Sequence, residues 1–93
     1  MIFHVGETVI CSIEVRDSDG ALADPATSMN ITITDNTNGI EVDDQAMSKD
    51  GTGLYHYDWN TSADAALGIY YITYTATDGS RISIEKDTVE LTA

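Results

Sequence analysis

Gly51-Thr-Gly-Leu-Tyr-His-Tyr-Asp-Trp59 and Gly68-Ile-Tyr-Tyr-Ile-Thr-Tyr-Thr-Ala-Thr-Asp78 are two aromatic segments that each begin at a glycine. Every aromatic residue except Phe3 lies in one of them. The side chains alternate with the period of two that is typical of β-strands. In the first segment this alternation places the tyrosines and Trp59 on one face. The two segments therefore predict strands whose large side chains fill a core between two sheets.

The rest of the chain predicts further short strands joined by turns. Thr8–Asp17 alternates with Val9 and Cys11 on one face, and Met29–Thr34 repeats the pattern. Turn signals follow each strand, in the form of Asp-Gly and Asn-Gly dipeptides. Lys49–Gly53 is expected to interrupt the strand pattern. Residues 60–67 have room for a helical turn or two at most. About seven short strands without a βαβ rhythm predict an all-β, antiparallel sandwich with Greek-key connections. An open barrel is the alternative.

The last predicted strand changes its alternation partway. Ile82 and Ile84 lie at even positions, whereas Val89 and Leu91 lie at odd ones. If all four side chains face the core, one extra residue has to be accommodated between the two pairs. We therefore expect a β-bulge near residues 85–87.

The chain of 93 residues is long enough for one domain, residues 1–93, with one modest core. Sixteen acidic residues against four basic ones give a formal net charge of −12. Such a surface repels nucleic acid and anionic lipid, so neither is an expected partner. Scattered carboxylates suit either calcium sites or a surface that stays hydrated at high salt. We favour the salt-adapted interpretation, because the acid is spread along the whole chain.

Compartment signals are few. The first residues lack the basic and apolar regions of a secretory signal, and no apolar run has the length of a transmembrane helix. Cys11 is the single cysteine, so an intrachain disulfide is excluded. These features predict synthesis in the cytosol followed by assembly into a larger particle, and a domain of a secreted, cell-surface protein is the alternative.

The segment Gly68-Ile-Tyr-Tyr-Ile72 resembles the penultimate strand of the immunoglobulin-like (Ig-like) superfamily. This resemblance implies that Tyr70 forms a tyrosine corner, with a buried ring and a hydroxyl bonded to nearby backbone. Ile72 then stands where antibody domains have a cysteine, and Cys11 stands near the place of its partner. Trp59 comes too late in the chain to be the tryptophan of the antibody pattern.

A wider resemblance covers nearly the whole chain. Segments 5–9, 15–20, 24–28, 51–57 and 68–71 follow one another as in the small Ig-like modules of prokaryotic surface proteins and tailed-virus particles. Macroglobulin-type and bacterial Ig-like domains are similar in the same way. The order of these segments implies the fold more specifically than a role, because this superfamily carries many functions.

Candidate chemistry is sparse. A catalytic set would need His4, His56 or Cys11 to converge, and the strand pattern places His56 and Cys11 on different faces, so we expect no enzyme. Turn carboxylates at one end of a sandwich are suitable ligands for calcium. The Asp17–Gly20 segment nevertheless lacks the full EF-hand pattern, so no cofactor is expected. The weak metal candidates are Asp17, Asp19, Asp43, Asp44 and Asp78.

Taken together, these features predict a structural or interaction module without enzymatic activity. The resemblance places it most naturally in a tailed-virus particle of a salt-adapted system, at the capsid surface or head-tail region. An adhesin or cell-surface domain with calcium-binding loops is the competing prediction. Binding is expected to use homo- or hetero-oligomeric contacts of edge strands near Ile2–Val5 and Arg81–Leu91, because exposed sheet edges accept strands from other chains.

Overall fold

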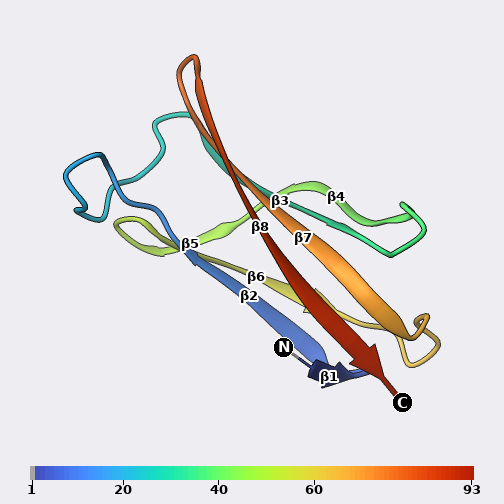
Figure 1. The fold of residues 1–93 in the computed structure, drawn as a ribbon. Helices are drawn as coiled ribbons and strands as arrows, with labels where there is room; N and C mark the ends of the chain where they lie inside the picture. The colour runs from blue at the N-terminus through green and yellow to red at the C-terminus, as the bar shows by residue number, and fades with distance from the viewer. Residues whose placement is uncertain (1) are drawn as a thin grey trace.

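A computed structural model describes residues 2–93, which form eight β-strands (Figure 1). The strands are β1 (Ile2–His4), β2 (Thr8–Glu14), β3 (Ser28–Thr34), β4 (Ile40–Ala46), β5 (Ser48–Gly51), β6 (Leu54–Asn60), β7 (Gly68–Asp78) and β8 (Arg81–Thr92). The number exceeds the expected seven by one. Ser48–Gly51, which overlaps the Lys49–Gly53 segment predicted to interrupt the strand pattern, forms β5 by pairing with β6.

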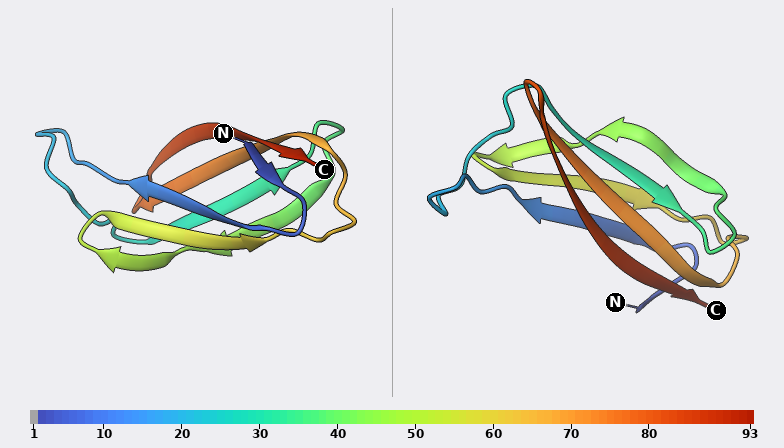
Figure 2. Two further views of the ribbon diagram at one scale, coloured as in Figure 1. Left: turned by 90° about the horizontal axis from the view of Figure 1, so that it is seen from below. Right: turned by 45° about the horizontal axis from the view of Figure 1, so that its top comes forward.

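The strands form two layered sheets (Figure 2). One has the order β1-β8-β7-β3-β4, and the other has the order β2-β6-β5. All pairings are antiparallel except that of β1 with β8. The central order β3-β7-β8 against β2-β6-β5 corresponds to the C-F-G and B-E-D strands of an Ig-like domain. The predicted all-β Ig-like sandwich is therefore confirmed.

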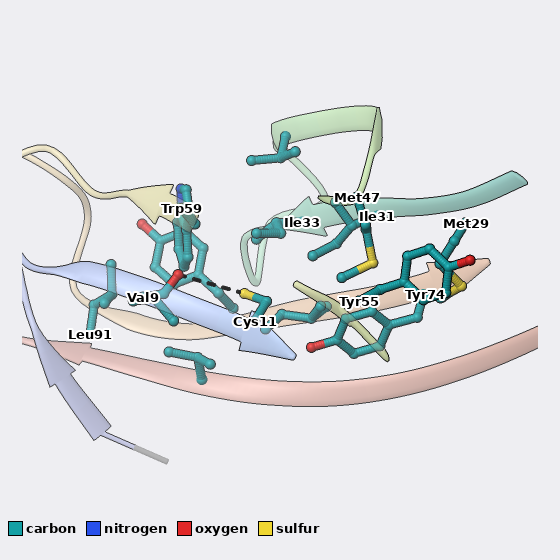
Figure 3. Packing of buried hydrophobic residues seen from close by; sticks show 14 residues of the cluster. Val9, Cys11, Met29, Ile31, Ile33, Met47, Tyr55, Trp59, Tyr74 and Leu91 are labelled. Atoms are coloured by element: carbon teal, nitrogen blue, oxygen red, sulfur yellow. Dashed lines mark hydrogen bonds between the residues drawn. The ribbon is translucent and has the colours of Figure 1, made fainter. Parts of the chain in front are cut away.

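The core lies between the sheets and contains the aromatic residues that the strand pattern placed there (Figure 3). Trp59 from β6 packs against Tyr70 from β7 with ring centroids 5.1 Å apart. Cys11 and Ile72, which stand at the cysteine positions of the antibody pattern, are both buried. The fold thus fills with apolar packing the region where antibody domains have their disulfide.

Tyr70 forms the predicted tyrosine corner. Its ring is buried, and its hydroxyl donates a hydrogen bond of 2.7 Å to the carbonyl oxygen of Ala66. This bond ties the β6–β7 connection to the start of β7. Residues 61–67 contain a turn and no helix, so the short helical turn allowed by the sequence does not form.

The long hairpin of β7 and β8 contradicts the bulge predicted near residues 85–87. The two strands pair without a register shift from Gly68 opposite Leu91 to Asp78 opposite Arg81. Alternation therefore continues unbroken, and Ile82 and Ile84 lie on the opposite face from Val89 and Leu91. The prediction was wrong because it assumed that all apolar residues of this strand face the core.

The hairpin extends beyond the other strands, as Figure 1 and the right view of Figure 2 show. All side chains of residues 81–88 are exposed, and burial begins only at Val89. Within residues 2–93, no helix is long and apolar enough to cross a membrane.

Candidate functional site

The sandwich has several sheet edges, and they differ in how open they are. β4 contains register shifts and the left-handed Asp44 (φ 48°), features that interrupt a regular ladder. β5 is only four residues long, whereas β2 is a regular edge of seven residues. β8, by contrast, is covered by β1 only at Glu90–Thr92. Its first eight residues therefore form a long, regular and uncovered edge, which we call the β8 edge (residues 81–88).

The direction of the backbone groups at the β8 edge follows from the hairpin turn. Gly79 (φ 62°) and Ser80 form a two-residue turn, so the pair Asp78–Arg81 that closes it exchanges hydrogen bonds. Antiparallel ladders alternate, and odd-numbered residues of β8 therefore bond to β7, whereas even-numbered ones point outward. The β1 contact agrees, because the Val5 N–H donates to the carbonyl of the even-numbered Thr92 at 2.9 Å.

The outward backbone groups belong to Ile82, Ile84, Lys86 and Thr88. Of these four amides, that of Thr88 is already satisfied, because it donates to the Asp87 carboxylate at 2.8 Å. The other three amides face solvent. A row of such donors and acceptors is a template for another strand.

Side chains at the β8 edge reinforce this interpretation. Ile82 and Ile84 are 64% and 58% exposed, so a partner that covered them would remove apolar surface from water. Among residues 2–93, ion pairs engage Arg16 and Lys49 but neither of the remaining basic residues, Arg81 and Lys86. Both unpaired cations of this very acidic chain thus lie on the same free edge.

A groove of about 430 Å³ opens beside the β8 edge, between the ends of the two sheets. Met29, Tyr74 and Ala76 contribute apolar surface to it, whereas Arg81 and Glu85 of β8 lie among its polar lining. In a strand added to β8, the side chains opposite the odd-numbered residues of β8 would face this groove, because cross-strand neighbours share a face. The edge and the groove are therefore parts of one surface.

The weak metal candidates lie on three different segments of the chain. Asp17 and Asp19 lie in the β2–β3 connection, where the Asp17 carboxylate accepts hydrogen bonds from the backbone amides of Asp19 and Ala21. Asp43 and Asp44 lie on β4, and Asp78 ends β7. Asp17 and Asp78 line the same groove. Across the described range 2–93, no three histidine, cysteine or acidic residues are grouped as metal ligands.

The candidate catalytic groups His56 and Cys11 have different surroundings. His56 bonds the exposed Asp50 carboxylate at 2.7 Å on the outer face of β6. Cys11 is buried, and burial together with the neighbouring Asp87 and Asp58 carboxylates raises the pKa of its thiol to about 11. A thiol with such a pKa stays protonated at neutral pH, so it is a poor nucleophile.

A second hollow, of about 560 Å³, lies at the opposite end of the sandwich near the β6–β7 connection. Its lining includes Glu41, Asp58 and Asp64 and contains neither lysine nor arginine. These carboxylates have no described cationic partner, and the hollow is separate from the β8 edge.

The sequence had already pointed to the strand near Arg81–Leu91 as an exposed edge. It did not reveal which residues are exposed, because Ile82 and Ile84 were assigned to the core. Their even positions, opposite in parity to Val89 and Leu91, were the available signal.

Comparison with known protein families identifies the family to which this fold belongs. The family described as the MG2 domain matches residues 1–89, which is nearly the entire chain. Its members have a macroglobulin-like Ig-like fold, in agreement with the two sheets described above. Searches of curated proteins and of solved structures give no match.

Proposed function

We propose that this chain, which belongs to the MG2 domain family, is a non-enzymatic module that binds protein by accepting an extended strand at the β8 edge. The observation that carries the proposal is the uncovered, regular ladder of residues 81–88. Family membership supports a binding role, because Ig-like MG2 domains generally mediate protein interactions.

Binding would proceed by β-augmentation. The incoming strand bonds to the outward backbone groups of Ile82, Ile84 and Lys86, which supply affinity with little dependence on sequence. Its side chains add specificity by covering the exposed isoleucines on one face and by entering the groove on the other. No proton transfer or covalent step is required of any residue.

A simple peptide tests strand addition. The probe is a peptide of roughly ten residues, the upper length of common strands, with alternating threonine and valine and a lysine at each end. Titrated into isotope-labelled protein, it is expected to shift the amide resonances of Ile82, Ile84 and Lys86. Shifts confined to β2 or β4, or no shifts at all, would overturn the proposal.

The setting is a further part of the proposal. We place the module in a tailed-virus particle of a salt-adapted system, at the capsid surface or head-tail region, after synthesis in the cytosol. The resemblance of its segment order and its net charge of −12 support this setting. A cell-surface protein with calcium-binding loops is the alternative. Mass spectrometry of purified particles tests the first setting, and calorimetry with calcium chloride tests the loops.

A further inference from the structure

We infer that the β8 edge pairs with the β8 edge of a second copy of this chain, antiparallel, with Ile84 of both copies on the two-fold axis. This inference rests on the proposed strand-binding function and names the partner. A two-fold axis perpendicular to the sheet makes the same surface serve both copies. The two five-stranded sheets would then form one continuous sheet.

The backbone favours this register. Ile82 faces Lys86 of the second copy, Ile84 faces Ile84, and Lys86 faces Ile82. Each of these residues is even-numbered, so its amide and carbonyl point outward toward the second copy. The three amides used are those that face solvent, whereas the Thr88 amide, which Asp87 already satisfies, is not needed.

The side chains fit the same register. Arg81 lies opposite Asp87 of the second copy at both ends of the pairing, and Ser83 lies opposite Glu85. Opposite charges directly across a ladder are stabilising. Arg81, which has no ion pair within the described residues 2–93, thereby gains a partner. On the other face, Ile84 packs against its own copy, and both exposed isoleucines lose contact with water.

Neighbouring symmetric registers fit less well. A shift of one residue toward the C-terminus places Glu85 opposite Glu85, and like charges directly across a ladder are destabilising. That register also requires the occupied Thr88 amide. A further shift in the same direction places Lys86 opposite Lys86. A shift toward the N-terminus pairs Ser83 with Ser83 and shortens the ladder, because the strand begins at Arg81.

The net charge makes this pairing dependent on salt. Two copies of formal charge −12 repel each other at low ionic strength, and salt screens this long-range repulsion more than the short contacts of the ladder. A contact made by one strand of each copy is also expected to bury less than the roughly 1,600 Å² of a standard interface. We therefore expect a weak dimer whose population rises with protein concentration and with salt.

Matched proline variants test the edge. Ile84 and Ile10 are exposed to nearly the same extent, 58% and 59%, and both lie on edge strands. Both amides point outward. For Ile10 this follows from the alternation of the ladder, because Glu7 and Val15, the odd-numbered residues that flank β2, bond to Thr61 and Gly53 at the two ends of β6. Ile84→Pro is expected to abolish the dimer in sedimentation velocity at about 1 M salt, whereas Ile10→Pro keeps it. Thermal unfolding of both variants verifies the fold.

A charge exchange tests the register. Arg81→Asp and Asp87→Arg each place like charges across the pairing, so each variant alone is expected to dimerise at least about tenfold more weakly than the natural chain. Mixed together, they restore both opposite-charge pairs. Their changes in net charge are equal and opposite, so the mixed dimer carries the same total charge as the natural one. Failure of the mixture to dimerise would contradict the register.

The outcomes separate the two proposals. If the natural chain stays monomeric at all salt and protein concentrations but the threonine–valine peptide shifts the β8 amides, the second-copy inference is wrong and strand binding stands. Dimerisation that survives Ile84→Pro but not Ile10→Pro would move the interface to β2 and contradict the inference as well. If neither peptide nor second copy reaches β8, both proposals fail.

Discussion

Tyr70 shows how one side chain holds a corner of this fold. Its hydroxyl bonds Ala66, and its ring packs on Trp59. Tyr70→Phe keeps the ring but leaves the Ala66 carbonyl without this donor, so we expect a loss of about 1 kcal/mol in the free energy of unfolding. Equilibrium urea denaturation measures the loss. Tyr71→Phe is the control, because Tyr71 is 47% exposed and its loss is expected to be near zero.

Asp35 links stability to pH. Its carboxylate accepts hydrogen bonds from the hydroxyl and amide of Thr37 and from the Gly39 amide, and these bonds lower its pKa. A lowered pKa in the folded state means that the stabilisation is fully present above the unfolded value of about 3.9. It is lost as pH falls below that value and through the folded pKa.

We expect Asp35→Asn to lose less stability than the natural chain over this acid range. The measurement is the thermal midpoint between roughly pH 2 and pH 6 in about 1 M salt, which screens the general repulsion between carboxylates. Asp43→Asn removes the same charge from an exposed position on β4 and serves as the control. Equal acid sensitivity of the Asp35 variant and the natural chain would contradict this account.

Among the connections, the β5–β6 turn and the β2–β3 connection meet at Gly53. Its φ is +71°, and a methyl group there would lie 2.6 Å from the Val15 carbonyl oxygen and 2.9 Å from the Ala23 nitrogen. Both contacts are with backbone, which cannot move away cheaply. Gly53→Ala is therefore expected to cost more than about 2 kcal/mol of unfolding free energy.

Gly20→Ala is the matched comparison for the loss at Gly53. Gly20 has a similar φ of +83° but no atom within 4 Å of the added methyl. Only the backbone conformation is penalised there, at about 1 kcal/mol. If urea denaturation gives equal losses for the two variants, the close approach at Gly53 contributes nothing to stability.

The strands illustrate what the sequence can and cannot predict. Tyr55, Trp59 and Tyr70 were correctly predicted to be buried. Large apolar side chains that recur with a period of two lie on one face of a strand, and that face packs against the core. β8 could not be predicted in the same way. Residues 81–88 extend beyond the smaller sheet, so neither face of the strand is buried there. The positions of its apolar residues therefore do not indicate which face meets the core.

Strand pairing also determines two features that the local sequence does not predict, namely the extended conformation of β5 and the positions of the metal candidates. Ser48–Gly51 has weak strand propensity, yet the neighbouring β6 supplies a ladder that makes it extended. The five candidate carboxylates are distributed over the β2–β3 connection, β4 and the end of β7. Proximity in space depends on strand order, which local turn chemistry does not encode.

Across the whole molecule, the dominant electrostatic feature is the net charge of −12. Self-repulsion destabilises a compact acidic chain, and salt screens it. We therefore expect the urea midpoint to rise steadily from roughly 0.01 M to above 1 M monovalent salt. Measurements at low protein concentration keep dimerisation from adding to the effect. A midpoint independent of salt would contradict salt adaptation.

Strand pairing at β8 would also explain why such an exposed hairpin is compatible with a stable protein. Alone, residues 81–88 present apolar side chains and open backbone groups to water. A second copy covers both the apolar side chains and the backbone groups. No open edge remains at β8, because the β8 edge of each copy pairs with that of the other copy. The pairing is closed and two-fold, so it does not propagate into a fibre.

Amide hydrogen exchange of the β8 edge tests the central claim most directly. Exchange rates of Ile82, Ile84 and Lys86 are measured by nuclear magnetic resonance at low and high protein concentration in about 1 M salt. Dimerisation at β8 predicts fast exchange of these amides in dilute solution and slower exchange as the protein concentration rises, with little change in β2. Equally fast exchange of these three amides at every concentration would contradict it.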